Sequence, residues 1–252
     1  PRRGHGSVPG DPAGTRPAPL AREGGRGGPA RRLLAPVLAL PLLAAPLPSL
    51  REAVERFDAA QARVGTFQAP FTLTTRRALL KTPSVTKGTV YLQDTRFVHF
   101  AFAPPEDLVL HLTPKALVSY SPAAGQGEML KIGWIRNADR RFLGLGQRLS
   151  ELSDYFKTEL AEDREVPGSY RLDLLPRALS VRRRMQVLRI WVDRESWLPR
   201  QVLWVERGGD TWQLEMGPPT RSRPLPAAVT GFQVPEGVPL RAEFSFFATR
   251  RK

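Results

Sequence analysis

Short runs in which apolar and polar residues alternate recur along the chain from residue 66 onward. The first of these runs places apolar side chains at Phe67, Ala69, Phe71 and Leu73. Successive side chains of a strand point to opposite faces, so this period of two is typical of a half-buried β-strand. Similar runs follow at residues 90–92, 98–102, 108–112, 116–120, 129–132, 170–174, 187–192, 202–205 and 212–216. The pattern predicts a mainly β (α+β) fold with antiparallel pairing.

Two segments have a helical period instead. Ser49 followed by Glu52 forms a capping box, and a predicted helix follows with apolar residues at Leu50, Val54, Phe57 and Val64. A second short amphipathic helix is predicted between the two sets of strands, from the spacing of Leu145, Leu149, Leu152 and Phe156.

Two further residues or segments predict local features of the sheet. Residues 207–210, Arg-Gly-Gly-Asp, predict a hairpin turn, because glycine accepts the positive φ angles that such turns require. Pro70 lacks a backbone N–H donor, so its strand is predicted to lie at an edge of the sheet or to carry a bulge.

The amino-terminal part has a different composition. Residues 1–30 are rich in Gly, Pro, Ala and Arg and are predicted to form a disordered arm. Residues 31–47 begin with two arginines, continue with an apolar stretch and end in small residues, which indicates a signal peptide. A membrane anchor is the alternative, but this stretch is short and is interrupted by Pro36 and Pro41. The prediction is therefore an exported single domain at residues 48–252.

The formal charge of +14 raises the question of nucleic-acid binding. Seven of the arginines lie in residues 1–32, and the rest of the basic residues are spread along the chain. The block at residues 182–184 looks like a turn between strands. No zinc-finger, helix-turn-helix or aromatic RNA-binding pattern accompanies the charge, so solvated loops are the preferred interpretation and no nucleic-acid partner is expected.

The sequence contains none of the catalytic or metal-binding motifs that we searched for. The chain has no cysteine, and its histidines are His5, His99 and His111, none of them at metal-ligand spacing or beside a Ser and Asp pair. No P-loop, G-x-S-x-G or H-E-x-x-H motif occurs. We therefore expect no enzyme activity, no catalytic residue, no metal and no cofactor.

Large apolar residues occur on both faces of some predicted strands. Residues 97–102 and 187–192 are examples, and the chain has five Trp and twelve Phe. Such a sheet is covered on both sides or lines a cavity, and an ordinary core is the alternative.

Several segments resemble the outer-membrane lipoprotein carrier family, the LolA-like proteins, from about Leu50 to Leu240. Their order and spacing carry the resemblance more than any single motif does. The matching segments are Val-Gly-Thr-Phe-Gln-Ala-Pro-Phe at 64–71, Gly-Thr-Val-Tyr-Leu at 88–92, the aromatic strand before Pro105, Leu-Val-Ser-Tyr-Ser-Pro at 117–122, Leu-Leu-Pro at 174–176 and Phe-Gln-Val-Pro-Glu-Gly-Val at 232–238.

The resemblance implies an unclosed, curved antiparallel half-barrel with helices that cover its concave apolar face. It also implies a monomeric periplasmic chaperone for outer-membrane biogenesis, which binds the acyl chains of lipoproteins. An inner-membrane exporter would supply the cargo and an outer-membrane receptor would accept it. The residues expected in the lipid-binding cavity are Phe71, Leu73, Val90, Leu92, Phe100, Phe102, Trp212 and Leu214, and those expected in the lid are Leu149, Leu152 and Phe156.

The sequence departs from the family pattern in the bend before the aromatic strand. Asp94 occupies the place of the family's arginine, and Arg96 follows two residues later. This difference leaves two alternatives open beside the lipoprotein carrier. One is a diverged periplasmic carrier of another lipid or hydrophobic cargo, and the other is a LolA-like periplasmic sensor or interaction module.

Overall fold

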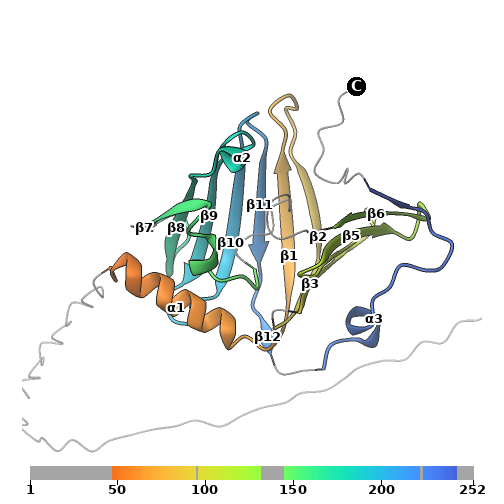
Figure 1. Cartoon of the computed structure of the whole chain (residues 1–252), viewed down its shortest axis with the longest axis horizontal. Helices are drawn as coiled ribbons and strands as arrows, with labels where there is room; N and C mark the ends of the chain where they lie inside the picture. Colours follow the sequence, from red (N-terminus) through yellow and green to blue (C-terminus); the bar gives the residue numbers. More distant parts are fainter. Residues whose placement is uncertain (1–46, 95, 132–144, 222–223, 243–252) are drawn as a thin grey trace, which may run out of the picture. The chain divides into compact units, whose positions relative to one another are not determined.

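A computed structural model describes residues 47–94, 96–131, 145–221 and 224–242 (Figure 1). The described residues all belong to one compact unit, Ala45–Lys252. The predicted arm and almost all of the predicted signal peptide lie outside the described residues. None of the described helices combines the length and the apolar character that crossing a bilayer would require.

Thirteen described strands form one sheet that does not close on itself. Its order is β13-β6-β5-β4-β3-β2-β1-β11-β10-β9-β8-β7, and β12 pairs with β1 beside β11. The strands are β1 (Thr66–Arg76), β2 (Ser84–Gln93), β3 (Phe97–Phe102), β4 (Val109–Leu112), β5 (Ala116–Ser121), β6 (Gln126–Lys131), β7 (Phe156–Glu162), β8 (Ser169–Pro176), β9 (Met185–Asp193), β10 (Pro199–Glu206), β11 (Thr211–Met216), β12 (Thr220–Arg221) and β13 (Leu240–Arg241). β13 pairs with β6 in parallel, and all other pairs of described strands are antiparallel. The mainly β fold with an unclosed curved sheet is confirmed.

The predicted first helix is α1 (Leu50–Ala62). The hydroxyl of Ser49 accepts a hydrogen bond from the Glu52 backbone N–H at 3.2 Å, which confirms Ser49 as the N-cap. One face of α1 is buried through Ala53, Phe57 and Gln61. Ala53 and Phe57 belong to the same apolar core as the sheet.

The register of the sheet confirms the predicted alternation. Phe71 lies opposite Met216 and Gly88, and Leu73 lies opposite Leu214. Since paired residues share a face, the register carries one apolar face from β5 across β1 to β8. The described residues on this face form one hydrophobic core together with α1.

Pro70 lies in an interior strand, so of its two predicted alternatives, an edge strand or a bulge, the edge strand was wrong. β2 pairs with all of this part of β1, and Pro70 lies opposite Thr89. On the other side, β11 ends opposite Phe71 and β12 begins opposite Gln68. Pro70 therefore falls at the break between these two strands, where its carbonyl accepts the Gly217 N–H at 2.8 Å and where the N–H that proline lacks is not needed.

The predicted second helix was wrong in its extent. The segment contains one short 3₁₀ turn, η2 (Ser150–Leu152), and Phe156 is the first residue of β7. The apolar spacing from Leu145 to Phe156 combines a turn with the inward positions of a strand, which imitates a helical period. In the described part of the chain, α1 and η2 both contribute buried residues to the core on the concave face.

The opposite face of the sheet has its own covering. The helix α3 (Ala227–Thr230) leads to Phe232, whose ring centroid lies 5.2 Å from that of His99 and 4.9 Å from that of His111.

A further short helix, α2 (Leu179–Arg182), joins β8 to β9, so the arginine block at 182–184 lies between strands as predicted. The turn at 207–210 joins β10 to β11, and its Gly209 has a φ of 87°.

Candidate ligand-binding face

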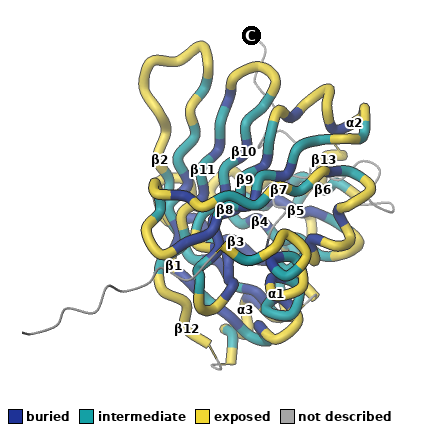
Figure 2. The backbone as a smooth tube through the Cα atoms, turned by 90° about the vertical axis from the view of Figure 1, so that its left-hand side faces the viewer, coloured by how far each residue is buried: buried dark blue, intermediate teal, exposed yellow. Residues whose placement is uncertain are grey.

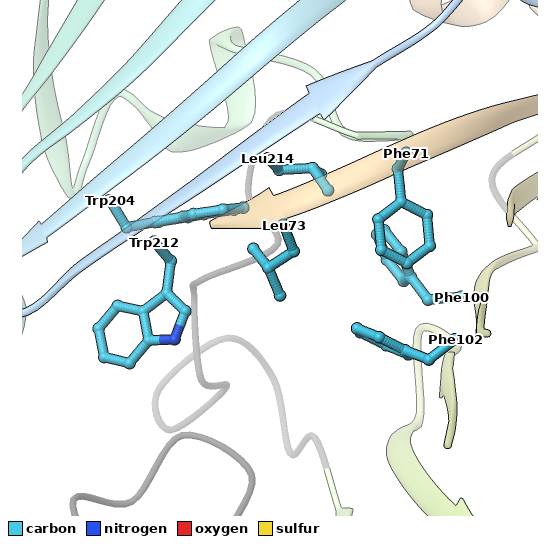
Figure 3. Close-up of a pocket in the computed structure, with 7 residues that line it drawn as sticks. All are labelled: Phe71, Leu73, Phe100, Phe102, Trp204, Trp212 and Leu214. Carbon is cyan, nitrogen blue, oxygen red and sulfur yellow. The ribbon is translucent and has the colours of Figure 1, made fainter. Parts of the chain in front are cut away.

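Seven apolar side chains from four strands, β1, β3, β10 and β11, converge on the concave face (Figure 3). All of them are buried. The space that they leave has a volume of about 10 Å³, which is room for about one water molecule. They are Phe71, Leu73, Phe100, Phe102, Trp204, Trp212 and Leu214.

The aromatic rings of this group meet edge to face. The ring of Phe71 lies 5.4 Å from that of Phe100 at 83° and 5.1 Å from that of Phe102 at 81°. This geometry is favourable for aromatic pairs, because the positive ring edge meets the negative ring face. The three rings lie together in Figure 3.

Gly88 makes room for this arrangement. It lies opposite both Phe71 and Phe102. A Cβ atom at this position would lie 2.8 Å from the Phe71 ring and would also collide with the carbonyl oxygen of Ala101. A glycine is therefore required for the Phe71 ring to lie over β2.

Two tryptophans form the other side of the group. Trp204 on β10 lies directly opposite Trp212 on β11. The guanidinium of Arg77 lies 5.0 Å from the centroid of the Trp212 ring, and its Nη1 donates to Asp210 Oδ2 at 3.0 Å. One ion pair thus places a cation over the ring at this end of the apolar face.

The cover of the opposite end is held by polar contacts of α1. Asp58 accepts the backbone N–H of Leu149 at 2.6 Å and that of Ser150 at 3.3 Å. Gln61 accepts the N–H of Gly146 at 3.2 Å. These contacts attach α1 to residues 146–152, which we call the η2 segment, above the strands.

The structure brings the predicted cavity residues to one face. All eight are buried in the same core, although Val90 and Leu92 do not line the small space. Trp204 was missed as a site residue, although it lies in a predicted strand run and shares the parity of Val202. Its position opposite Trp212 depends on strand pairing, which the sequence alone does not fix. Whether this face binds a lipid stays a prediction.

The predicted lid residues are also buried in this core. Leu149 and Leu152 lie at the η2 turn, whereas Phe156 belongs to the sheet. Their role in a lid stays a prediction.

The face offers no titratable group among its seven lining residues. No three metal-ligating side chains gather anywhere in the part of the chain that the structure describes.

A wider space of about 160 Å³ lies against β5 and β6, and its lining includes Ser119, Glu128 and Arg241. Ser119 there donates to Glu128 at 3.3 Å, so polar groups take part in the lining of this space, unlike that of the aromatic one.

The bend with Asp94 and Arg96 lies at the β2–β3 turn. Both residues are exposed, and Asp94 has a φ of 47°. Neither lines the aromatic space.

No family model matches the sequence, and no curated protein matches it. Solved structures match it at low identity. A protein of Thermus thermophilus is 13% identical, with a TM-score of 0.48 over 77% of this chain and 98% of that one. A LolA superfamily protein of Nitrosomonas europaea is 11% identical, with a TM-score of 0.41 over 72% and 97%. A chain of the MucA/MucB complex of Pseudomonas aeruginosa is 14% identical, with a TM-score of 0.43 over 71% of this chain and 59% of that one. The likeness is one of fold alone.

Proposed function

We propose that this protein is a periplasmic carrier that holds acyl chains of lipoproteins against the concave face of its sheet. In this role it would receive cargo at the inner membrane and release it at the outer membrane. The proposal includes no chemical step, in keeping with the apolar lining of the face.

The observation that carries the proposal is the continuous apolar face with its aromatic group. Each methylene that leaves water contributes about 0.8 kcal/mol, so an acyl chain needs a broad, dry surface and no hydrogen-bonding partner. The side chains around Phe71, Phe100 and Trp212 supply this kind of surface.

An acyl chain requires more room than about 10 Å³, so loading requires part of the cover to move. The contacts of Asp58 and Gln61 hold backbone groups of the η2 segment through a few hydrogen bonds. Each such bond contributes a net 0.5–1.5 kcal/mol or so, which burial of several methylenes offsets. Cargo would thus select an open state of the cover.

Asp94 favours a second candidate, a carrier of another lipid. A carboxylate occupies the place where the lipoprotein carriers that this sequence resembles have an arginine. A handover that uses this arginine would not work in the same way here.

Mass spectrometry of lipids that copurify with the protein from a periplasmic fraction tests both candidates. Triacylated peptides would support the lipoprotein carrier, and free phospholipid or glycolipid would support the second candidate. A protein that is reproducibly free of lipid, and that takes up none when lipid is added, would contradict both.

A further inference from the structure

At one end of the sheet, where neighbouring strands are joined by turns, exposed apolar side chains lie among many cations. This region consists of three segments, residues 76–85 at the β1–β2 hairpin, 177–184 around α2 and 206–210 at the β10–β11 turn, which we call the basic edge. All three lie at the top of the sheet in Figure 1, and their loops are exposed in Figure 2.

Hydrogen bonds hold the three segments side by side. The N–H of Ala78 donates to Asp210 Oδ1 at 2.8 Å, which joins the hairpin to the β10–β11 turn. Arg207 donates from Nε to the carbonyl of Arg182 at 2.8 Å and from its backbone N–H to the carbonyl of Arg184 at 2.9 Å. The basic edge is therefore one continuous surface.

The apolar part of this surface is unusually exposed. Leu79 is 92% exposed and Leu80 65%, and both extend beyond the last paired residues of the hairpin, Thr75 and Ser84. Four of the seven large apolar residues that are strongly exposed in the described part lie on the basic edge: Leu79, Leu80, Val85 and Leu179. The free energy falls when an apolar phase covers such side chains, because their surface leaves water.

Cations surround these leucines. The three segments contain eight basic residues and two acidic ones. Of the two acids, Asp210 is paired with Arg77. The exposed cations are Arg76, Lys81, Arg177, Arg182, Arg183, Arg184 and Arg207.

We propose that the basic edge docks the protein on an anionic phospholipid membrane, with Leu79 and Leu80 inserted below the headgroups. A bilayer has negative charge at its surface and an apolar layer beneath it, which is the order of groups that this edge would complement. The proposal goes beyond cargo binding, because it specifies the surface on which the carrier loads or unloads.

The position of the edge relative to the apolar face fits this role. Arg77 belongs to the hairpin and lies over Trp212, so the aromatic group begins directly behind the edge. The contacts of Asp58 and Gln61 lie at the other end, where Gly146 approaches Leu92. A docked protein would present the Trp212 end of the apolar face to the bilayer.

A site-specific label tests the proposal in the full chain. The chain has no cysteine, so Leu80→Cys accepts a single environment-sensitive fluorophore. With vesicles that contain phosphatidylglycerol, its emission should shift to the blue, and spin-labelled acyl chains should quench it. The same label at Leu240→Cys, an exposed leucine on β13, is the control and should not change. A label at residue 80 that stays in water on vesicle-bound protein would overturn the proposal, as would the absence of vesicle binding.

Charge variants separate the edge from general attraction. Arg76→Glu with Lys81→Glu should weaken binding to these vesicles by about tenfold or more. Arg63→Glu with Lys115→Glu makes the same change of net charge at exposed positions elsewhere and should change binding by less than about threefold. Equal losses in both variants would overturn the proposal. Cargo uptake in detergent-free solution, without vesicles, should be the same in both, so a failure of docking is distinguishable from a failure of cargo binding.

Discussion

Asp58 accepts the backbone N–H of Leu149 at 2.6 Å, so a single carboxylate on α1 holds the start of η2. The same side chain accepts the N–H of Ser150 at 3.3 Å. A short polar side chain that binds the first free N–H groups of a helical turn acts as a cap. The cover of the apolar face therefore depends on a small number of identifiable contacts.

We expect Asp58→Ala to loosen this cover without unfolding the sheet. The backbone N–H groups of Leu149 and Ser150 should exchange with solvent deuterium faster, and the free energy of unfolding should fall by about 1 kcal/mol, as for a lost cap. Asp154→Ala, which removes an exposed carboxylate from the turn after η2, is the control. Unchanged exchange at Leu149 would contradict the role of Asp58.

Gly88→Ala should disturb the aromatic group. The added methyl would lie 2.8 Å from the Phe71 ring and against the Ala101 carbonyl, so strand or ring must shift. Overpacking of this kind lowers the free energy of unfolding by about 1–3 kcal/mol. Gly208→Ala is the matched control, since nothing lies within 4 Å of its added carbon. Urea unfolding measures both, and equal stabilities of the two variants would argue against the tight approach at Gly88.

The stability of the protein should decrease in mild acid because of His99. Burial, together with the neighbouring His111, lowers the pKa of His99 to about 4. Burial lowers the pKa of His111 as well. The two Nδ1 atoms are 3.1 Å apart, so one neutral ring donates to the other, and Phe232 packs on both.

The unfolded chain takes up a proton on histidine near pH 6.5, whereas folded His99 does so only near pH 4. The neutral pair therefore contributes its full stability above pH 6.5, and this contribution is lost as the pH falls through 4. Urea unfolding at pH 7.5, 6 and 5 should show the decrease, and His99→Phe should reduce the slope. A wild-type slope that persists in this variant would assign the effect to other groups.

The sequence predicted the sheet well, because the period of two determines which side chains share a face. Phe71, Leu73, Phe100 and Leu214 were assigned to one face by parity, and they meet there. The N-cap at Ser49 was equally local and equally predictable.

Features that depend on distant segments were not predictable in the same way. The role of Trp204 requires the pairing of β10 with β11, and the place of Pro70 requires the break between β11 and β12. The segment at 145–156 has apolar residues at helical spacing, yet Phe156 pairs opposite Pro176 in the sheet. Tertiary contacts decided its conformation there.

Trp204 and Trp212, the two tryptophans that line the aromatic space, allow the most direct test of acyl-chain binding. A brominated fatty acid should quench the tryptophan fluorescence of the wild type, because bromine quenches at short range. The double variant Trp204→Phe, Trp212→Phe should lose most of this quenching. Trp191→Phe should keep it, since Trp191 is buried on the opposite face of β9, next to Ile190. Quenching that survives in the double variant and disappears with Trp191→Phe, or no quenching in any of the proteins, would contradict binding at the concave face.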